Sequence, residues 1–219
     1  MTVVLIDRTH AVADALARLL PSAAIEGGSF ESALPRPHTL ELEQRERLLS
    51  ATREAATNQC IARAFEVLGY DASLIVRHRP TGERDWPAGL VGSVTHKGAL
   101  ILVAIAPSAN CNGIGIDLER HISGEIEAIT DDIAPEGLPR RLPRDVAATI
   151  AFSAKEAIFK AQFGLTGKPL EFRDVELDWE LAELPQSRIA ACLGGLRLSV
   201  GAMVVGSRWV VAAAKAIIA

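Results

Sequence analysis

Apolar positions along the chain recur at two different spacings, which predict helices in some segments and strands in others. Spacings of three and four residues are typical of one face of a helix. They occur in three segments: 11–20, about 41–68 and 145–164. Gly69 follows the second segment and is a natural helix stop, because glycine readily adopts the left-handed conformation that ends many helices. We therefore expect three helices, the second of them long.

Strands are expected where apolar residues alternate with polar ones or form short unbroken runs. Eight segments meet this description: 3–6, 74–77, 91–95, 99–106, 112–118, 172–181, 196–205 and 209–218. The segment 99–106 is almost wholly apolar, which is typical of a buried strand. Residues 21–38, rich in Gly, Ser and Pro, are interpreted as irregular, and residues 122–145 as loop with short helical pieces.

The order of these elements predicts an α+β fold. Connections within 91–118 are too short for parallel crossovers, so this part is expected to form an antiparallel meander. A helix with a small antiparallel sheet occurs twice, which predicts two lobes, one over residues 1–107 and one over residues 108–219. A chain of 219 residues is long enough to build both.

Composition narrows the class of protein. The formal net charge of −4 argues against a general nucleic-acid-binding protein, and the 49% hydrophobic content argues against disorder. The three cysteines form no CxxC pair, so neither a disulfide framework nor a zinc site is indicated. The N-terminus lacks the basic start of a signal peptide, and the apolar C-terminal run is too short to span a bilayer. We expect a cytoplasmic protein without a membrane partner.

Acidic residues at two places are candidates for metal binding. Asp117 and Glu119 stand two apart on an expected strand, so both carboxylates point to one side. Carboxylates, phosphate oxygens and water are the usual ligands of Mg²⁺, and the small residues of 113–116 would let a ligand approach the backbone. Solvated acids on an edge strand are the alternative. Glu156 borders the apolar stripe of the third helix and forms an i, i+4 pair with Lys160, either in a cleft or as a surface ion pair.

His96 ends a short segment that also contains Ser93, Thr95 and Lys97. These side chains are suited to bind phosphate oxygens, although a lone histidine is more often a hydrogen-bonded structural residue. A Ser–His pair also occurs in nucleophilic hydrolases. Ser93, however, lacks the GxSxG elbow of such enzymes, so phosphate binding is favoured.

Three stretches carry most of the candidate chemistry: Gly92-Ser-Val-Thr-His96, Gly115-Ile-Asp-Leu-Glu119 and Phe152-Ser-Ala-Lys-Glu-Ala-Ile-Phe-Lys-Ala161. In this order and at these separations they resemble the signatures of the 4'-phosphopantetheinyl transferases of the surfactin and enterobactin type. Residues 86–91 and 54–64 are similar to the enterobactin-type branch, so the resemblance spans roughly residues 50–165. It implies a pseudo-two-fold pair of similar lobes, each a small antiparallel sheet packed with a long helix, with the metal site at the lobe interface.

The resemblance also implies a reaction. Coenzyme A would donate 4'-phosphopantetheine to a serine of an acyl, peptidyl or polyketide carrier protein, with Mg²⁺ as cofactor and 3',5'-ADP as the product released. Asp117, Glu119 and Glu156 would hold Mg²⁺, and Glu156 and Lys160 would act in catalysis. We assign six further residues to coenzyme A binding: Ser93, His96, Lys97, Arg79, Arg84 and Lys155. The two-lobe interpretation favours a monomer.

Two positions depart from the usual pattern of this family. Gln59 stands where the family usually has an arginine, and Thr81 where it usually has a basic residue. Both family positions normally grip the phosphate or adenine of coenzyme A. Cations near them in the sequence could replace them: Arg53, Arg63, Arg79, Arg84 and Lys97. Two rival hypotheses stay open, a catalytically weakened homologue that binds coenzyme A or carrier protein, and a different metal-dependent phosphohydrolase.

Overall fold

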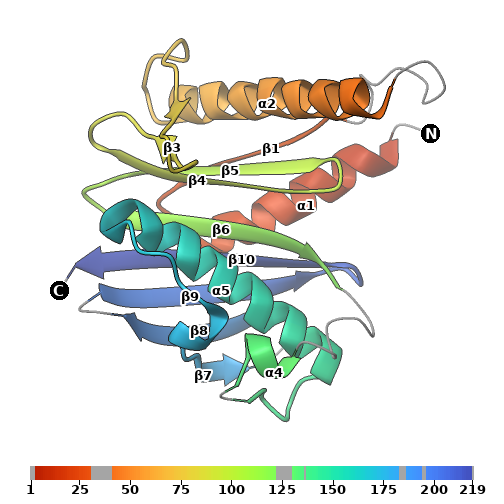
Figure 1. The fold of residues 1–219 in the computed structure, drawn as a ribbon, viewed down its shortest axis with the longest axis vertical. Coiled ribbons are helices and arrows are strands. Elements are labelled where there is room, and N and C mark those ends of the chain that lie inside the picture. Colours follow the sequence, from red (N-terminus) through yellow and green to blue (C-terminus); the bar gives the residue numbers. More distant parts are fainter. Residues whose placement is uncertain are drawn as a thin grey trace.

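The computed structural model describes residues 3–30, 41–121, 130–135, 137–182, 186–193 and 196–218. The fold is α+β with antiparallel sheets, as the sequence predicted (Figure 1). In the described part of the chain, no helix is both long enough and apolar enough to cross a membrane.

The first sheet lies under the long helix α2 (Leu42–Val67), which matches the predicted segment closely. Its three strands run antiparallel in the order β1 (Ala24–Ser29), β5 (Leu100–Pro107) and β4 (Leu90–Lys97). Alternate residues of β5 face opposite sides: Ile101 packs toward α2, and Leu102 packs toward the rest of the molecule. The apolar run is therefore buried on both faces, as predicted.

The second sheet has five antiparallel strands, with helix α5 (Arg144–Thr166) across one face (Figure 1). Their order is β6 (Gly113–Arg120), β10 (Trp209–Ile218), β9 (Leu196–Val205), β8 (Gln186–Leu193) and β7 (Asp178–Ala182). Alternating residues of β10, among them Val210 and Ala212, pack with the inner face of α5. Smaller elements lie at the edges: β2 (Arg77–His78) paired with β3 (Arg84–Asp85), helix α4 (Thr130–Ile133) and the 3-10 helix η3 (Phe172–Asp174).

Helix α1 (Val3–Leu19) lies between the two sheets (Figure 1). Its buried residues, such as Val12 and Leu16, share one apolar cluster with residues of β5, β6, β9 and β10. Each sheet therefore has its own helix on the outside, and both use α1 on the inside. The predicted lobe boundary between residues 107 and 108 falls directly after β5. The division into two lobes and their pseudo-two-fold relation stay predictions.

Two predictions near the N-terminus are wrong. Residues 3–6 belong to α1, which begins at Val3, and not to a strand, because a short apolar run fits either element. Residues 24–29, interpreted as irregular, form β1. Gly27 and Gly28, which favoured a loop in the sequence, are needed for packing. A Cβ at Gly27 would lie 2.8 Å from Thr9 of α1, and one at Gly28 would lie 2.8 Å from the sulfur of Cys60 on α2. Residues 31–38 lie outside the described residues.

Other strand predictions need correction. The segment 74–77 keeps only Arg77 as a strand residue, and Ile75 is exposed. Residues 172–181 divide into η3 and the start of β7, and β8 was not predicted at all. The meander is also wrong at its last strand: β6 leaves the first sheet and pairs with β10, so the chain crosses from one sheet to the other at residues 108–112. Of the segment 122–145, residues 122–129 and 136 lie outside the described residues.

Candidate active site

Two glycines of β6 let α5 pack against the strand at backbone distance. A Cβ at Gly115 would lie 1.9 Å from the carbonyl oxygen of Ala157, and one at Gly113 would lie 2.2 Å from that of Ala161. From the sequence, these small residues predict room for a ligand beside the backbone. The structure shows that α5 occupies the space instead, which brings its side chains directly over the acids of β6.

Asp117 of β6 is the centre of the resulting cluster, and its side chain is buried. Ser153 of α5 donates a hydrogen bond to Oδ2 at 2.9 Å, and Lys160 of α5 donates one to Oδ1 at 2.7 Å. Thr95 of β4 donates to Oδ1 at 3.3 Å. A buried carboxylate is costly unless it is paired and hydrogen-bonded, and Asp117 has both kinds of partner.

Glu119 and Glu156 lie near Asp117. Burial raises the pKa of Glu119, the hydrogen bond and charge of Lys97 oppose this shift, and the negative charge of Asp117 adds to it. Burial also raises the pKa of Glu156, the Lys160 ammonium lowers it, and the charges of Asp117 and Glu119 raise it further. The three carboxylates therefore repel one another electrostatically, as acids that share one site do.

The acids are not arranged as a finished metal site. Among the described residues, no group of three His, Cys, Asp or Glu side chains is placed to hold a metal ion. Lysines act as counter-ions instead: Lys160 pairs with Asp117 at 2.7 Å, and Lys97 pairs with Oε2 of Glu119 at 2.5 Å. A shared metal ion would require these ammonium groups to move aside.

The donor set nevertheless fits a hard divalent cation. Three carboxylates supply oxygen ligands of the kind that Mg²⁺ prefers. Oε2 of Glu119 is buried and lies 2.5 Å from the ammonium of Lys97. A buried carboxylate oxygen requires a cation beside it, so a metal ion suits this position in place of the ammonium.

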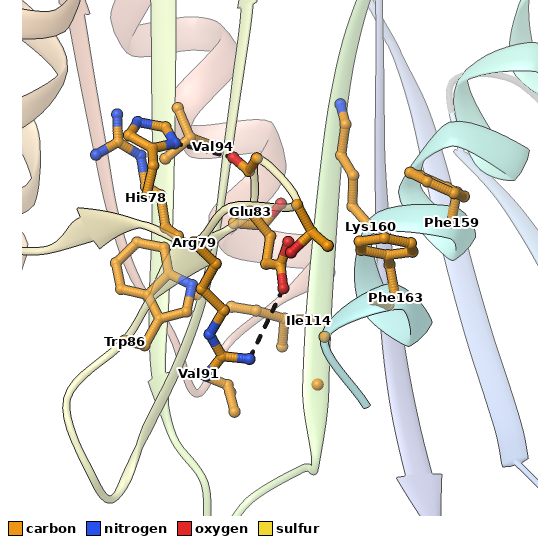
Figure 2. Close-up of a pocket in the computed structure, with 18 of the residues that line it drawn as sticks. His78, Arg79, Glu83, Trp86, Val91, Val94, Ile114, Phe159, Lys160 and Phe163 are labelled. Carbon is orange, nitrogen blue, oxygen red and sulfur yellow. Dashed lines mark hydrogen bonds and ion pairs between the residues drawn. The ribbon is translucent and has the colours of Figure 1, made fainter. Parts of the chain in front are cut away.

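A cavity of about 590 Å³ opens beside this cluster, lined by α2, the β2–β3 hairpin, β4, β6 and α5. Figure 2 shows its two walls, with His78 and Arg79 on one side and Phe159 and Phe163 of α5 on the other. Lys160 lines the cavity as well as pairing with Asp117, so it joins the acid cluster to the cavity. We call the side with His78 and Arg79 the basic wall and the side with Phe159 and Phe163 the apolar wall. Two such walls suit a ligand that has both phosphate and apolar parts.

Two predicted phosphate ligands of the basic wall already have acidic partners. Arg84 donates two hydrogen bonds to the carboxylate of Glu54, at 3.0 and 2.8 Å, which ties the hairpin to α2. Burial would raise the pKa of Glu54, but the hydrogen bond and charge of Arg84 outweigh it and lower that pKa. Arg79 pairs with Asp85 at 2.6 Å. Both guanidinium groups line the cavity with their charge largely balanced.

Arg53 of α2 differs from these arginines. Its Nη1 lies 2.9 Å from Nε2 of His96, and among the described residues it forms no ion pair with a carboxylate. Burial lowers the pKa of His96, and the charges of Arg53, Lys160 and Lys97 lower it further. The lowered pKa favours the neutral ring, and because a guanidinium only donates, Nε2 of His96 accepts the hydrogen bond from Arg53. Both side chains line the cavity, which leaves positive charge there for an anion to balance.

The remaining assigned residues lie at different distances from the cavity. Ser93 lines it, but its hydroxyl accepts a hydrogen bond from the backbone N–H of Ile116 at 3.1 Å, which joins β4 to β6. Lys155 does not line the cavity: it is buried and donates to the carbonyl of Phe172 at 2.9 Å. Of the two departures, Thr81 lines the cavity, whereas Gln59 is exposed and does not.

Sequence reasoning missed one residue and one contact of the site. It gave no role to Ser153, although this residue precedes Glu156 by three positions and Lys160 by seven, which places all three on one helix face. It also missed the hydrogen bond from Thr95 to Asp117, which depends on β4 and β6 lying side by side in different sheets. No local pattern reports such a contact.

Comparison with known proteins identifies the family of this chain. The family model of the 4'-phosphopantetheinyl transferase superfamily matches residues 113–200, which contain β6 and α5. The 4'-phosphopantetheinyl transferase Svp of Streptomyces mobaraensis is 32% identical over 174 residues, covering 74% of this chain and 70% of the relative. The chain therefore belongs to the 4'-phosphopantetheinyl transferase superfamily and is an enzyme of this type.

Two further relatives support the same family. The 4'-phosphopantetheinyl transferase PptT of Mycobacterium tuberculosis is 29% identical over 176 residues, covering 75% of this chain and 77% of the relative. Enterobactin synthase component D of Salmonella austin is 32% identical over 129 residues, covering 56% of this chain and 54% of the relative. The resemblance read from the three signatures is thus confirmed at the level of the family.

Proposed function

We propose that this protein transfers 4'-phosphopantetheine from coenzyme A to a serine hydroxyl of a carrier protein, with Mg²⁺ as cofactor. The observation that carries the proposal is the position of Lys160, which pairs with Asp117 inside the acid cluster and also lines the cavity. A pyrophosphate in the cavity would thus meet the Lys160 ammonium, next to three carboxylates that could hold a metal ion. This is the set of charges that phosphoryl transfer needs, because its catalysis is mainly positioning and charge neutralisation.

Coenzyme A fits the two walls of the cavity. Its phosphates would lie on the basic wall, with Arg53 and His96 among the donors, and the adenine toward residues 79–89. The pantetheine arm would follow Phe159 and Phe163 on the apolar wall. Binding is expected to weaken as salt rises, because phosphate charge contributes much of the attraction.

In the reaction, the serine oxygen of the carrier forms a bond to the phosphorus that bears pantetheine. The bond from that phosphorus to the bridging oxygen breaks, and 3',5'-ADP leaves with the electron pair. Asp117, Glu119 and Glu156 would hold Mg²⁺, which supplies neutralisation of the pyrophosphate charge. Lys160 donates to a phosphate oxygen, and Glu156 accepts the serine proton.

Arg53 explains how the chain can bind phosphate despite the neutral Gln59. The side chain of Gln59 is exposed and outside the cavity, whereas Arg53 lies about 1.7 turns earlier on α2 and lines the cavity. The other candidate substitutes are paired with acids: Arg63 with Glu26 at 3.0 Å, and Lys97 with Glu119. We propose that Arg53, together with His96, supplies the missing phosphate contact.

The proposal also includes the cellular setting and the overall arrangement of the molecule. The partners are coenzyme A and an acyl, peptidyl or polyketide carrier protein, and the enzyme works as a cytoplasmic monomer. The two sheets with their outer helices α2 and α5 are its two lobes, related by a pseudo-two-fold axis, with the acid cluster between them.

The decisive experiment is mass spectrometry of a purified carrier protein after incubation with this protein, coenzyme A and Mg²⁺. The expected result is a mass increase equal to one 4'-phosphopantetheine group on the carrier. A carrier with its acceptor serine changed to alanine is the first control, and the Asp117→Ala variant of this protein is the second. An unmodified mass across acyl, peptidyl and polyketide carriers would reject the proposal.

A catalytically weakened homologue is the second candidate, and the neutral side chains at Gln59 and Thr81 favour it. It predicts that coenzyme A binds in calorimetry while no carrier gains mass. A metal-dependent phosphohydrolase makes a different prediction, since it would release 3',5'-ADP from coenzyme A without any carrier. Chromatography of the nucleotide products, with and without carrier, therefore separates the three functions.

A further inference from the structure

Ser153 is a polar residue with no exposed surface, on the face of α5 that packs against the second sheet. Its neighbours on the helix, such as Ala154 and Ala157, are equally buried but apolar. A buried hydroxyl costs free energy unless it makes a hydrogen bond. The partner that Ser153 has is the carboxylate of Asp117.

The two oxygens of Asp117 are held differently. Lys160 and Thr95 both donate to Oδ1, while Ser153 donates to Oδ2 at 2.9 Å. A carboxylate held at one oxygen alone can turn about its Cβ–Cγ bond, because this terminal torsion is broad. When both oxygens accept hydrogen bonds, the carboxylate group stays in a single orientation about this bond. Lys160, which donates to Oδ1, also lines the cavity, so Oδ1 is the oxygen of Asp117 that is linked to the cavity.

Resting on the proposed function, we infer that Ser153 is a positioning residue for the metal-binding step. By holding Oδ2 of Asp117, it keeps Oδ1 directed to the place where a divalent cation would replace the ammonium of Lys160. Partners that orient metal-binding side chains in this way typically affect metal affinity or activity by about 10- to 100-fold when they are removed. Ser153 itself touches neither substrate nor metal in this arrangement.

Thr149, one turn earlier on α5, shows what a purely structural hydroxyl does on the same helix. It too has no exposed surface, and its hydroxyl donates to the backbone carbonyl of Asp145, four residues back, at 2.8 Å. This is the usual bond of a serine or threonine inside a helix. Ser153 instead directs its hydroxyl across to β6. The Thr149→Val variant, which removes a hydroxyl and keeps the side-chain size, is therefore a matched control.

The test is a titration of the full-length protein with Mn²⁺, followed by the electron paramagnetic resonance signal of free Mn²⁺, with and without coenzyme A. Ser153→Ala is expected to weaken Mn²⁺ binding by about tenfold or more, and Thr149→Val by less than about twofold. Ser153→Cys, close in size but a weaker donor, should lie between them. Urea unfolding of each variant confirms that it folds.

Three results would overturn the inference: equal Mn²⁺ affinity in the parent and Ser153→Ala, equal losses in Ser153→Ala and Thr149→Val, or no Mn²⁺ binding by the parent. None of these readouts depends on transfer to a carrier. A parent that binds Mn²⁺ through a Ser153-dependent site but modifies no carrier would reject the proposed function and support the role of Ser153. The two failures are thus distinguishable.

Discussion

Replacing Gly115 by alanine tests whether the close contact between β6 and α5 positions the site. The added Cβ would lie 1.9 Å from the carbonyl oxygen of Ala157 and 2.6 Å from the backbone nitrogen of Ala161. The helix would have to move away by about 1 Å before this contact became tolerable. Overpacking usually costs about 1–3 kcal/mol. We expect the upper end, because both obstructing groups are backbone atoms and no side chain can rotate away.

The same movement should damage catalysis. Ser153 and Lys160 reach Asp117 at 2.9 and 2.7 Å, so a shift of α5 breaks or lengthens both hydrogen bonds. A misplacement of about 1 Å can cost about 10²-fold in rate. Gly115→Ala is thus expected to lose both stability and transfer activity.

Urea unfolding followed by tryptophan fluorescence measures the change in stability, and the carrier-mass assay measures activity. Gly164→Ala is the control for stability, since it lies in the same helix and its Cβ would meet nothing within 4 Å. That variant should gain about 0.5–1 kcal/mol from the better helix propensity of alanine. If Gly115→Ala unfolded within about 0.5 kcal/mol of the parent, the contact would not have the importance that we give it.

Three other predictions follow from the site. Arg53→Ala is expected to raise the KM for coenzyme A by about tenfold or more. Gln59→Arg should leave the KM nearly unchanged, because residue 59 lies outside the cavity. Equal effects of the two variants in steady-state kinetics would contradict this. Glu156→Gln should stabilise the metal-free protein at neutral pH and abolish transfer, because burial raises the pKa of Glu156 and so disfavours its charged form; a lower urea midpoint than the parent would refute it. Since the pKa of His96 is lowered from 6.5, the unfolded chain binds a proton there before the folded one does. Stability should therefore fall as the pH drops below 6.5 toward the lowered pKa, and fall less in His96→Gln, as urea midpoints over this range would show.

Much of the fold was visible in the sequence because some segments carry an unambiguous period. The helices around Phe65 and Ile158 were predicted nearly in full, since their apolar positions keep the helical spacing over many residues. The N-terminal segment failed because four consecutive apolar residues have no period. β1 failed because Gly27 and Gly28 were interpreted as loop residues, although the packing of neighbouring helices requires them. These reasons are tertiary, so the local sequence does not contain them.

The site was predictable in its residue types and less so in its contacts. The spacing of Asp117 and Glu119 showed that both acids share a face, and the signatures brought in Glu156 and Lys160. The sequence did not show that lysines would neutralise Asp117 and Glu119. Nor did it separate the cavity-lining Arg53 from arginines already paired with acids, because such pairs depend on which elements the fold brings together.

The shared helix α1 has a consequence for how the molecule holds together. Val12 and Leu16 fill the space between the sheets, and Leu19 packs so closely over β9 that a Cβ at Gly201 would lie 2.7 Å from it. A fragment of residues 1–107 would therefore leave the inner face of α1 exposed, and a fragment of residues 108–219 would leave the matching face of β9 and β10 exposed. Neither piece should fold alone. When the two fragments are co-expressed, they should assemble by fragment complementation, and recovered activity would show that they have assembled.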